Sequence, residues 1–133
     1  MKNVAIREHH LYNKAFKNGK RQVGKYVAVY ILRDLAAHRL QKAHPQKLIV
    51  NRLGLSVSKK VGGAVERNRA KRLIRAAYDS VKGELKVGNL IVISPRTAIL
   101  GAKSTEVAEE LRAAFGALGL ISLKPQNEDE QTL

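Results

Sequence analysis

The sequence predicts one α/β (α+β) domain, a two-layer sandwich with helices packed on a small mixed sheet. The chain has 133 residues, the size of a single domain, and 44% of them are hydrophobic, enough for one core. Segments with helical spacing of apolar residues alternate with short runs rich in β-branched residues. The resulting order, α-β-β-α-β-α, favours a sandwich over a helical bundle or a barrel.

The first half of the chain contributes one helix and two extended segments. A short helix ending at a glycine is expected within 7–20, where apolar residues have helical spacing. Residues 25–32 are rich in β-branched and aromatic residues and predict a strand. Residues 33–46 predict a long polar connection with at most a helical turn, broken by Pro45. The chain is expected to be extended again over 47–59.

The second half predicts a helix, a strand and a last helix. The long helix is expected over 65–82 and the strand over 89–94, the apolar stretch NLIVIS. The last helix is expected from 104 to about 118 with Ser104 or Thr105 as its N-cap. Its apolar stripe consists of Val107, Leu111, Phe115 and Leu118.

Residues 1–121 therefore form the predicted domain, and residues 122–133 form an acidic tail that we expect to be disordered. No run approaches the ~18 consecutive apolar residues that span a bilayer. The first ten residues lack the apolar segment of a secretory signal. Without cysteine there is no disulfide framework. These features predict a soluble cytoplasmic protein that does not enter a membrane.

Strand alternation separates two faces of the sheet. The face expected to meet the helices carries Val27, Val29, Ile31, Leu53, Leu55 and Val57. The opposite face carries Tyr26, Ala28, Tyr30, Arg52, Gly54, Ser56 and Ser58. Aromatic rings beside small polar residues and a cation suit unpaired nucleotides, which stack on rings. Simple packing of both tyrosines at the sheet rim explains the same pattern.

The net charge indicates a polyanionic partner. Lys and Arg number 25 against 11 Asp and Glu, which gives a formal net charge of +14. A domain this basic binds polyanions by counterion release, so nucleic acid is the expected partner. An anionic membrane surface is the weaker alternative, because the basic helix also has an apolar stripe to bury.

The long helix combines a buried stripe with a dense set of cations. The apolar arc comprises Ala70, Leu73, Ile74, Ala77, Tyr78 and Val81. Asn68, Lys71, Arg72 and Arg75 lie opposite this arc, and Arg67 and Arg69 lie near its two borders. Apart from Arg75, whose i,i+4 neighbour is Asp79, these cations lack opposite charges at i,i+4, so a polyanionic partner explains them better than a solvated face does. Just before the helix, Lys59, Lys60 and two glycines favour a phosphate at the helix N-terminus, although the glycines alone indicate only a turn.

Candidate catalytic sites are weak. The stretch GAKST at 101–105 resembles the end of a Walker A motif, but Ala102 stands where its last glycine should be. The four histidines lack the spacing of metal ligands, and no pair of carboxylates stands out. We therefore expect no catalytic residues in this chain.

The stretch RLGLSVSKKVGGAVERNRAKRLIRAAY, residues 52–78, resembles the signature of the bacterial ribonuclease P protein component. The resemblance extends to YNKAFKNGKR near the N-terminus, to the strand NLIVIS and to the helix from Ser104. A match of this length is highly specific. The connection over 33–47 is longer than is usual in the family, and no role is assigned to it.

The resemblance implies a fold like that of the second domain of ribosomal protein S5, with a left-handed βαβ crossover through the basic helix. It implies a holoenzyme in which a catalytic RNA, with Mg²⁺, hydrolyses precursor tRNA to remove the 5′ leader. The protein, one monomer per catalytic RNA and without a small-molecule substrate, would bind that RNA through Lys59, Lys60, Arg67, Asn68, Arg69, Lys71, Arg72 and Arg75. The 5′ leader would contact Tyr12, Phe16, Tyr26, Tyr30, Arg52, Ser56 and Ser58. The resemblance also implies metal ions near the basic helix and the leader surface, but it does not identify their protein ligands in this chain.

Two other functions compete with this interpretation. A ribosome-associated RNA-binding module of similar sheet topology would bind ribosomal RNA without preferring a tRNA that carries a leader. DNA binding through a helix-turn-helix motif is disfavoured, because the basic helix follows a strand and has no preceding helix at the required spacing.

Overall fold

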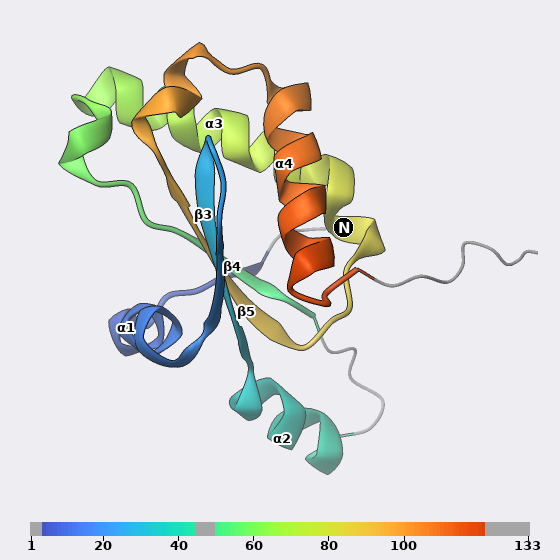
Figure 1. Ribbon diagram of the computed structural model, residues 1–133. Helices are drawn as coiled ribbons and strands as arrows, with labels where there is room; N and C mark the ends of the chain where they lie inside the picture. Colours follow the sequence, from blue (N-terminus) through green and yellow to red (C-terminus); the bar gives the residue numbers. More distant parts are fainter. Residues whose placement is uncertain (1–3, 45–49, 122–133) are drawn as a thin grey trace, which may run out of the picture.

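The computed structural model describes residues 4–44 and 50–121, which form a five-stranded sheet with helices on both faces (Figure 1). The strands lie in the order β1-β4-β5-β3-β2. Strands β1 (Val4–Ala5), β4 (Arg52–Leu55) and β5 (Asn89–Pro95) are parallel to one another. Strands β3 (Val27–Arg33) and β2 (Lys20–Val23) continue the sheet antiparallel. The mixed sheet of the predicted α/β sandwich is confirmed, and the predicted tail at 122–133 lies outside the described residues.

The main core lies between the sheet and two helices, α3 (Ala64–Val81) and α4 (Ser104–Ala117). The sheet side of this core comprises Val27, Val29, Ile31, Leu53, Ile91 and Ile93. The parallel neighbours β4 and β5 are connected through α3, which forms the βαβ unit that the family resemblance implies. All six residues that were expected to face the helices pack in this core or against it, as strand alternation predicts.

The opposite face of the sheet is covered by α1 (His9–Asn18), which ends at Gly19 as predicted. A smaller core of Ile6, Ala15, Leu90 and Val92 lies between α1 and the sheet. Gly19 allows the chain to turn tightly from α1 into β2. A Cβ atom there would lie 2.5 Å from the Ala15 carbonyl oxygen and 2.7 Å from that of Ile31.

The connection after β3 has more helix than the single turn that the sequence predicts. It forms a helix of nine residues, α2 (Leu35–Ala43), which lies at the end of the sheet (Figure 1). Asp34 caps it, because its Oδ1 accepts a hydrogen bond from the Ala37 amide at 3.2 Å. The pattern was not recognisable because α2 has no buried residue and is held by contacts with residues distant in sequence. The break expected at Pro45 lies outside the described residues.

Two other expectations require correction. Strands β1 and β2 were not predicted, because β1 has two residues and β2 is exposed along its whole length. The N-cap of α4 is Lys103 rather than Ser104 or Thr105. Glu106 Oε1 accepts the hydrogen bond of the Lys103 amide at 2.8 Å, so a carboxylate in the first turn satisfies the backbone N–H at the N-cap.

No helix within the described ranges is both long and apolar enough to cross a membrane. Three short turns of 3-10 helix complete the fold: η1 (Lys59–Val61) before α3, η2 (Lys82–Glu84) after it, and η3 (Thr97–Gly101) before α4. The first of these turns carries the two lysines ahead of the basic helix.

Candidate nucleic-acid interface

Helix α3 presents its cations to solvent while its apolar arc is buried. Ala70, Ile74, Ala77, Tyr78 and Val81 are at most 3% exposed, as the helical periodicity predicts. The polar residues Asn68, Arg69, Arg72 and Arg75 are exposed, and Arg67 and Lys71 are half-buried. None of the cations from Arg67 to Arg75 forms an ion pair with a carboxylate in the described part of the chain. These positive charges are therefore available to an external anion.

The turn before α3 positions Lys59 and Lys60. The Ser58 hydroxyl accepts a hydrogen bond from the Lys60 amide at 3.3 Å, and Gly62 adopts φ 142°, a conformation that favours glycine. At the helix N-terminus, the Gly63 amide donates to Glu66 Oε1 at 3.0 Å. The phosphate position predicted there is thus partly filled by the helix's own carboxylate, and the exposed lysines remain as the anion-binding groups of the turn.

A hollow of about 350 Å³ lies beside the first turns of α3. Its lining residues are Leu55, Val57, Ala64, Arg67, Asn68 and Lys71. The hollow brings three residues of the predicted catalytic-RNA set together with the end of β4. Two of its lining residues, Arg67 and Lys71, are cations.

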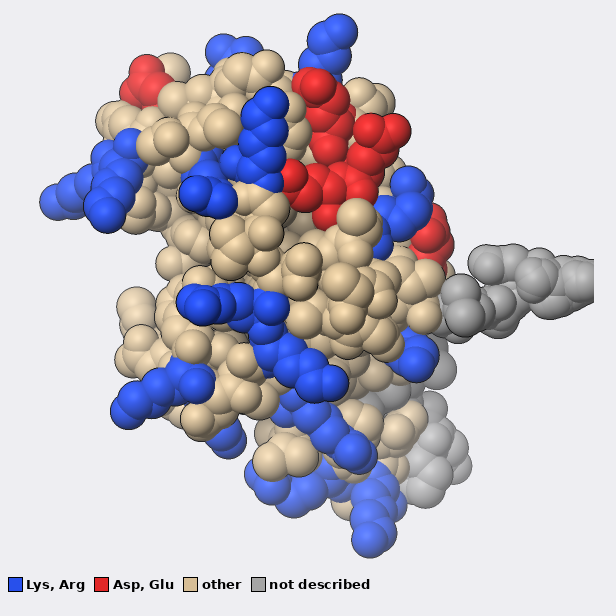
Figure 2. Space-filling view, viewed as in Figure 1, with Lys and Arg blue, Asp and Glu red and all other residues tan. Residues whose placement is uncertain are grey.

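Many of the acidic residues lie on one part of the surface. Figure 2 shows carboxylates gathered over α4, whereas lysines and arginines cover much of the remaining face. Helix α4 carries Glu106, Glu109 and Glu110. On the α4 side, Glu84 also holds Arg112 in an ion pair of 2.9 Å. This charge distribution disfavours a polyanion on the outer face of α4.

The second predicted surface is the sheet face under α1. Tyr30, Val92 and Gly54 lie side by side on β3, β5 and β4. The Tyr12 ring lies directly on Gly54, since a Cβ atom there would be 2.6 Å from ring atoms. Phe16, which is 40% exposed, makes an edge contact with Tyr30 at 4.8 Å between ring centroids. Three predicted aromatic residues thus form one partly exposed surface.

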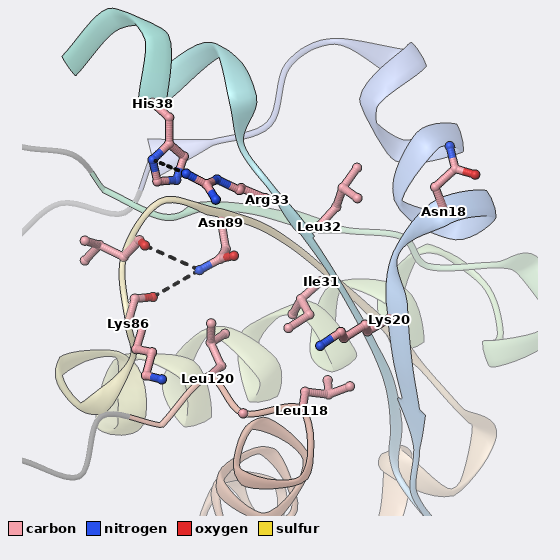
Figure 3. A pocket seen from close by; sticks show the side chains of 12 residues that line it. Asn18, Lys20, Ile31, Leu32, Arg33, His38, Lys86, Asn89, Leu118 and Leu120 are labelled. Carbon is pink, nitrogen blue, oxygen red and sulfur yellow. Dashed lines mark hydrogen bonds between the residues drawn. The ribbon is translucent and has the colours of Figure 1, made fainter. Parts of the chain in front are cut away.

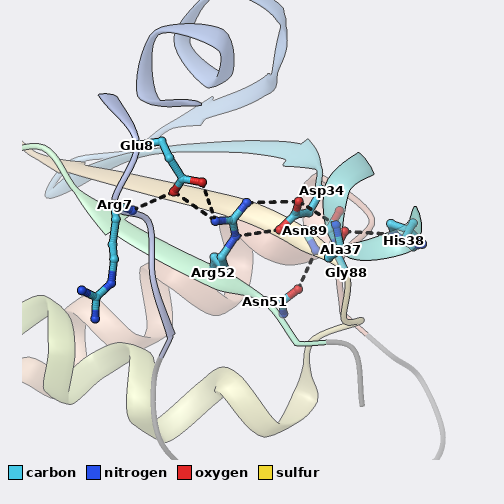
Figure 4. A network of polar contacts seen from close by, with 9 residues as sticks. All are labelled: Arg7, Glu8, Asp34, Ala37, His38, Asn51, Arg52, Gly88 and Asn89. Atoms are coloured by element: carbon cyan, nitrogen blue, oxygen red, sulfur yellow. Dashed lines mark hydrogen bonds and ion pairs between the residues drawn. The ribbon is translucent and has the colours of Figure 1, made fainter. Parts of the chain in front are cut away.

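Arg52, at the edge of this surface, is held by two carboxylates (Figure 4). Its Nε donates to Asp34 Oδ2 at 2.8 Å and its Nη2 to Asp34 Oδ1 at 3.2 Å. Its Nη1 donates to Glu8 Oε1 at 3.2 Å. The Arg52 side chain is 19% exposed and Asp34 only 2%. Arg52 therefore joins β4 to the N-termini of α1 and α2, and its charge is largely compensated within the protein.

The network changes the acidity of its members. The hydrogen bond to Asp34 is the main cause that raises the pKa of Arg52. Desolvation raises the pKa of the Glu8 carboxyl, but hydrogen bonds from Arg52 and the backbone, with the Arg52 charge, together lower it below its usual value. Both groups are therefore charged across the physiological range.

Tyr26 does not lie on the aromatic surface, and its predicted face was wrong. The strand begins at Val27, two residues later than predicted, and Tyr26 packs against the main core on the α3 and α4 side. Its amide and those of Lys25 and Val27 all donate to the Glu110 carboxylate at 2.8 Å. These three hydrogen bonds to the Glu110 carboxylate fix the backbone at the start of β3, so Tyr26 does not follow the alternation of side chains along the strand.

The remaining predicted residues are placed at the junction between the two surfaces. Ser56 follows β4 and is half-buried, with its amide donating to the Ile93 carbonyl at 3.0 Å. Ser58 is exposed and caps the turn that carries the two lysines. Reasoning from sequence missed Asp34, Glu8 and Glu110, because isolated acids give no pattern until the fold supplies their partners.

No three His, Asp or Glu side chains are grouped so as to hold a metal ion within residues 4–44 and 50–121. The histidines and carboxylates of this part of the chain therefore give no candidate metal centre. The arrangement offers cations, aromatic rings and small polar groups, which suit binding.

Comparison with known proteins decides the family. The family model described as ribonuclease P matches residues 1–119. The chain belongs to the ribonuclease P protein family. The ribonuclease P protein component of Clostridium acetobutylicum is 30% identical over 127 residues, covering 96% of this chain and 98% of the relative. That of Lachnoclostridium phytofermentans is 34% identical over 110 residues, covering 80% and 82%.

Solved ribonuclease P proteins share the fold. The Staphylococcus aureus protein superposes with a TM-score of 0.71 at 22% identity, covering 91% of this chain and all of that one. The Thermotoga maritima protein superposes with a TM-score of 0.62 at 26% identity, covering 85% and 94%. The resemblance noted in the sequence is confirmed: this ribonuclease P protein is a protein component of ribonuclease P.

Proposed function

We propose that this ribonuclease P protein binds the catalytic RNA of the holoenzyme through α3 and the adjacent turn, and binds the unpaired 5′ leader of precursor tRNA on the surface under α1. The observation that carries the proposal is the family match over residues 1–119 together with these two separate surfaces. The holoenzyme would remove the leader by hydrolysis, as an endoribonuclease acting in tRNA maturation.

The catalytic-RNA surface is argued from charge. Lys59, Lys60, Arg67, Asn68, Arg69, Lys71, Arg72 and Arg75 surround the N-terminal half of α3. Because the arginines and lysines of α3 lack intramolecular ion pairs among the described residues, phosphate contacts would replace only water and counterions. The hollow lined by Arg67, Asn68 and Lys71 gives such contacts a concave surface.

The leader surface is argued from the aromatic side chains. Phe16 and Tyr30 meet edge to face, and Tyr12 lies on Gly54, two strands away from Tyr30 with β5 between them. A partly exposed ring such as Phe16 can stack on an unpaired base, which contributes ~1–3 kcal/mol per base. Ser56 and Ser58 connect this surface to the lysines of the turn. Tyr26 is left out of the proposed site.

Arg52 has a positioning role in this proposal. Its guanidinium is fixed by Asp34 and Glu8, so it holds the N-terminus of α1 against β4. The aromatic residues of α1 therefore keep their place over the sheet. Its remaining exposure, 19%, leaves a contact with the leader possible at one edge only.

We further propose that the catalytic centre belongs to the RNA and that the protein improves substrate and Mg²⁺ binding. The described histidines and acids do not fit a Mg²⁺ site, so no step of the protein is assigned to the ion. One monomer per catalytic RNA is expected.

Reconstitution tests the proposal. Full-length protein is combined with its catalytic RNA and with precursor tRNA that carries or lacks a leader, and cleavage is followed over a Mg²⁺ titration. The protein alone should cleave neither substrate, while its addition should lower the Mg²⁺ requirement and improve binding of the substrate with a leader. Identical cleavage with and without the protein would contradict the proposal. Tight binding to ribosomal RNA with no preference for a leader would favour the ribosome-associated alternative.

A further inference from the structure

A larger cavity, of about 530 Å³, lies at the end of the sheet where β3 ends and β5 begins (Figure 3). Its apolar lining comes from Ile31, Leu32, Val87, Leu118 and Leu120, and its polar lining from Asn18, Lys20, Arg33, His38, Lys86 and Asn89. No residue of the proposed catalytic-RNA or leader surfaces lines it. It is therefore a separate site.

The charge of this cavity is uniformly positive. Lys20 and Lys86 stand on opposite sides of the opening, with Arg33 and His38 on a third side and Leu118 and Leu120 facing them (Figure 3). Among the described residues, no carboxylate belongs to the lining. Within the described part of the chain, the three cations Lys20, Arg33 and Lys86 form no ion pair. An anionic group that enters would meet three uncompensated cations.

His38 fixes the orientation of Arg33. The Nε2 atom of His38 lies 3.1 Å from the Gly88 carbonyl oxygen, and its Nδ1 lies 3.5 Å from Arg33 Nη2. A carbonyl only accepts and a guanidinium only donates, so both contacts are hydrogen bonds when the His38 proton is on Nε2 and Nδ1 accepts. Helix α2, to which the sequence assigned no role, thus positions one cation of the cavity.

We propose that this cavity binds a nucleoside monophosphate unit, either free or as one nucleotide of an RNA strand. Its volume lies in the range of small-molecule sites, which combine apolar walls with a few polar groups. The phosphate would lie between the cations, and the base would pack on Leu118 and Leu120. This inference about the cavity rests on the proposed function in one respect: a protein that binds RNA meets RNA strands as the most available source of nucleotides.

Methyl NMR of the full-length protein tests this inference directly. Titration with adenosine 5′-monophosphate should shift the methyl signals of Leu118, Leu120 and Val87 saturably and leave those of Leu55 and Val57, beside α3, unchanged. Inorganic phosphate serves as the control and should not shift the leucines. Absence of saturable shifts, or equal shifts with inorganic phosphate, would overturn the assignment to a nucleotide. A short single-stranded RNA in a third titration distinguishes a nucleotide within a strand from a free one.

Matched variants locate the site. Lys20→Gln and Lys86→Gln each remove a charged contact and should weaken binding of adenosine 5′-monophosphate about tenfold. Lys103→Gln, at an exposed lysine before α4, should leave it unchanged. Equal binding by all variants would overturn the inference. If the cavity does not bind the nucleotide but Arg72→Ala still weakens catalytic-RNA binding, only the cavity assignment is wrong. If the cavity binds the nucleotide but Arg72→Ala leaves catalytic-RNA binding unchanged, only the proposed function is contradicted.

Discussion

Replacement of Asp34 separates the two interactions that the structure assigns to this residue. Its carboxylate caps α2 through the Ala37 amide and also accepts two hydrogen bonds from Arg52. Asp34→Asn keeps a good N-cap residue but removes the negative charge, whereas Asp34→Ala removes both. The difference in the free energy of unfolding between Asp34→Asn and Asp34→Ala therefore measures the contribution of the N-cap of α2.

The magnitudes follow from burial and geometry. Asp34 is 2% exposed and Arg52 19%, so solvent screens the pair weakly. Loss of a hydrogen bond to a charged group costs ~1.5–3 kcal/mol, and loss of an N-cap to alanine ~1 kcal/mol. Asp34→Asn should therefore lower the free energy of unfolding by about 2 kcal/mol and Asp34→Ala by about 3 kcal/mol.

Urea denaturation followed by far-UV circular dichroism measures these changes, since the chain has no tryptophan. Glu84→Gln is the matched control, because the Glu84–Arg112 pair is exposed at both ends, 38% and 48%. It should change the free energy of unfolding by less than ~1 kcal/mol. An Asp34→Asn protein as stable as the wild type would refute the reasoning that Arg52 is anchored by this charge.

Three further outcomes are expected. Burial and the nearby charge of Asp79 raise the pKa of Tyr78 to about 12, so the free energy of unfolding should fall as pH rises from about 10 to about 12. In urea denaturation the Tyr78→Phe protein should lose less stability over that range, and an equal loss would contradict this assignment. Glu110→Gln should lower the free energy of unfolding by ~1.5–3 kcal/mol, because three backbone amides donate to its carboxylate. Replacement of the exposed Glu109 by Gln on the same helix should change the free energy of unfolding by no more than ~0.5 kcal/mol, and equal unfolding midpoints of the two variants would exclude a structural role for Glu110. Gly54→Ala should displace the Tyr12 ring and weaken leader binding, with affinity for the catalytic RNA unchanged in a filter-binding assay; unaltered leader binding would show that the ring position is irrelevant.

Helix α3 was predictable because its signals are local. A stripe at helical spacing sets the buried arc from Ala70 to Val81, and charges of one sign mark the rest. Alternation likewise predicted which residues of β3 and β4 meet the main core. Such patterns depend only on the periods of the helix and the strand.

Other features depend on partners distant in sequence. Helix α2 buries no residue, and Asp34 holds it through Arg52 on another strand. Strand β2 is exposed throughout and exists because it pairs with β3. Tyr26 departs from the alternation because Glu110 of α4 fixes the backbone just before Val27. In each case a tertiary contact overrides a weak local preference.

The division between the two surfaces is the central claim, and one measurement tests it most directly. The affinity of the reconstituted holoenzyme is measured for precursor tRNA with and without a leader, using wild-type protein, Phe16→Ala and Arg72→Ala. Phe16→Ala should weaken only the substrate with a leader, by ~1–3 kcal/mol. Arg72→Ala should instead weaken assembly with the catalytic RNA and reduce the salt slope of that assembly by about one. If both variants weaken binding of the leaderless tRNA equally, the two surfaces do not divide the RNA as proposed.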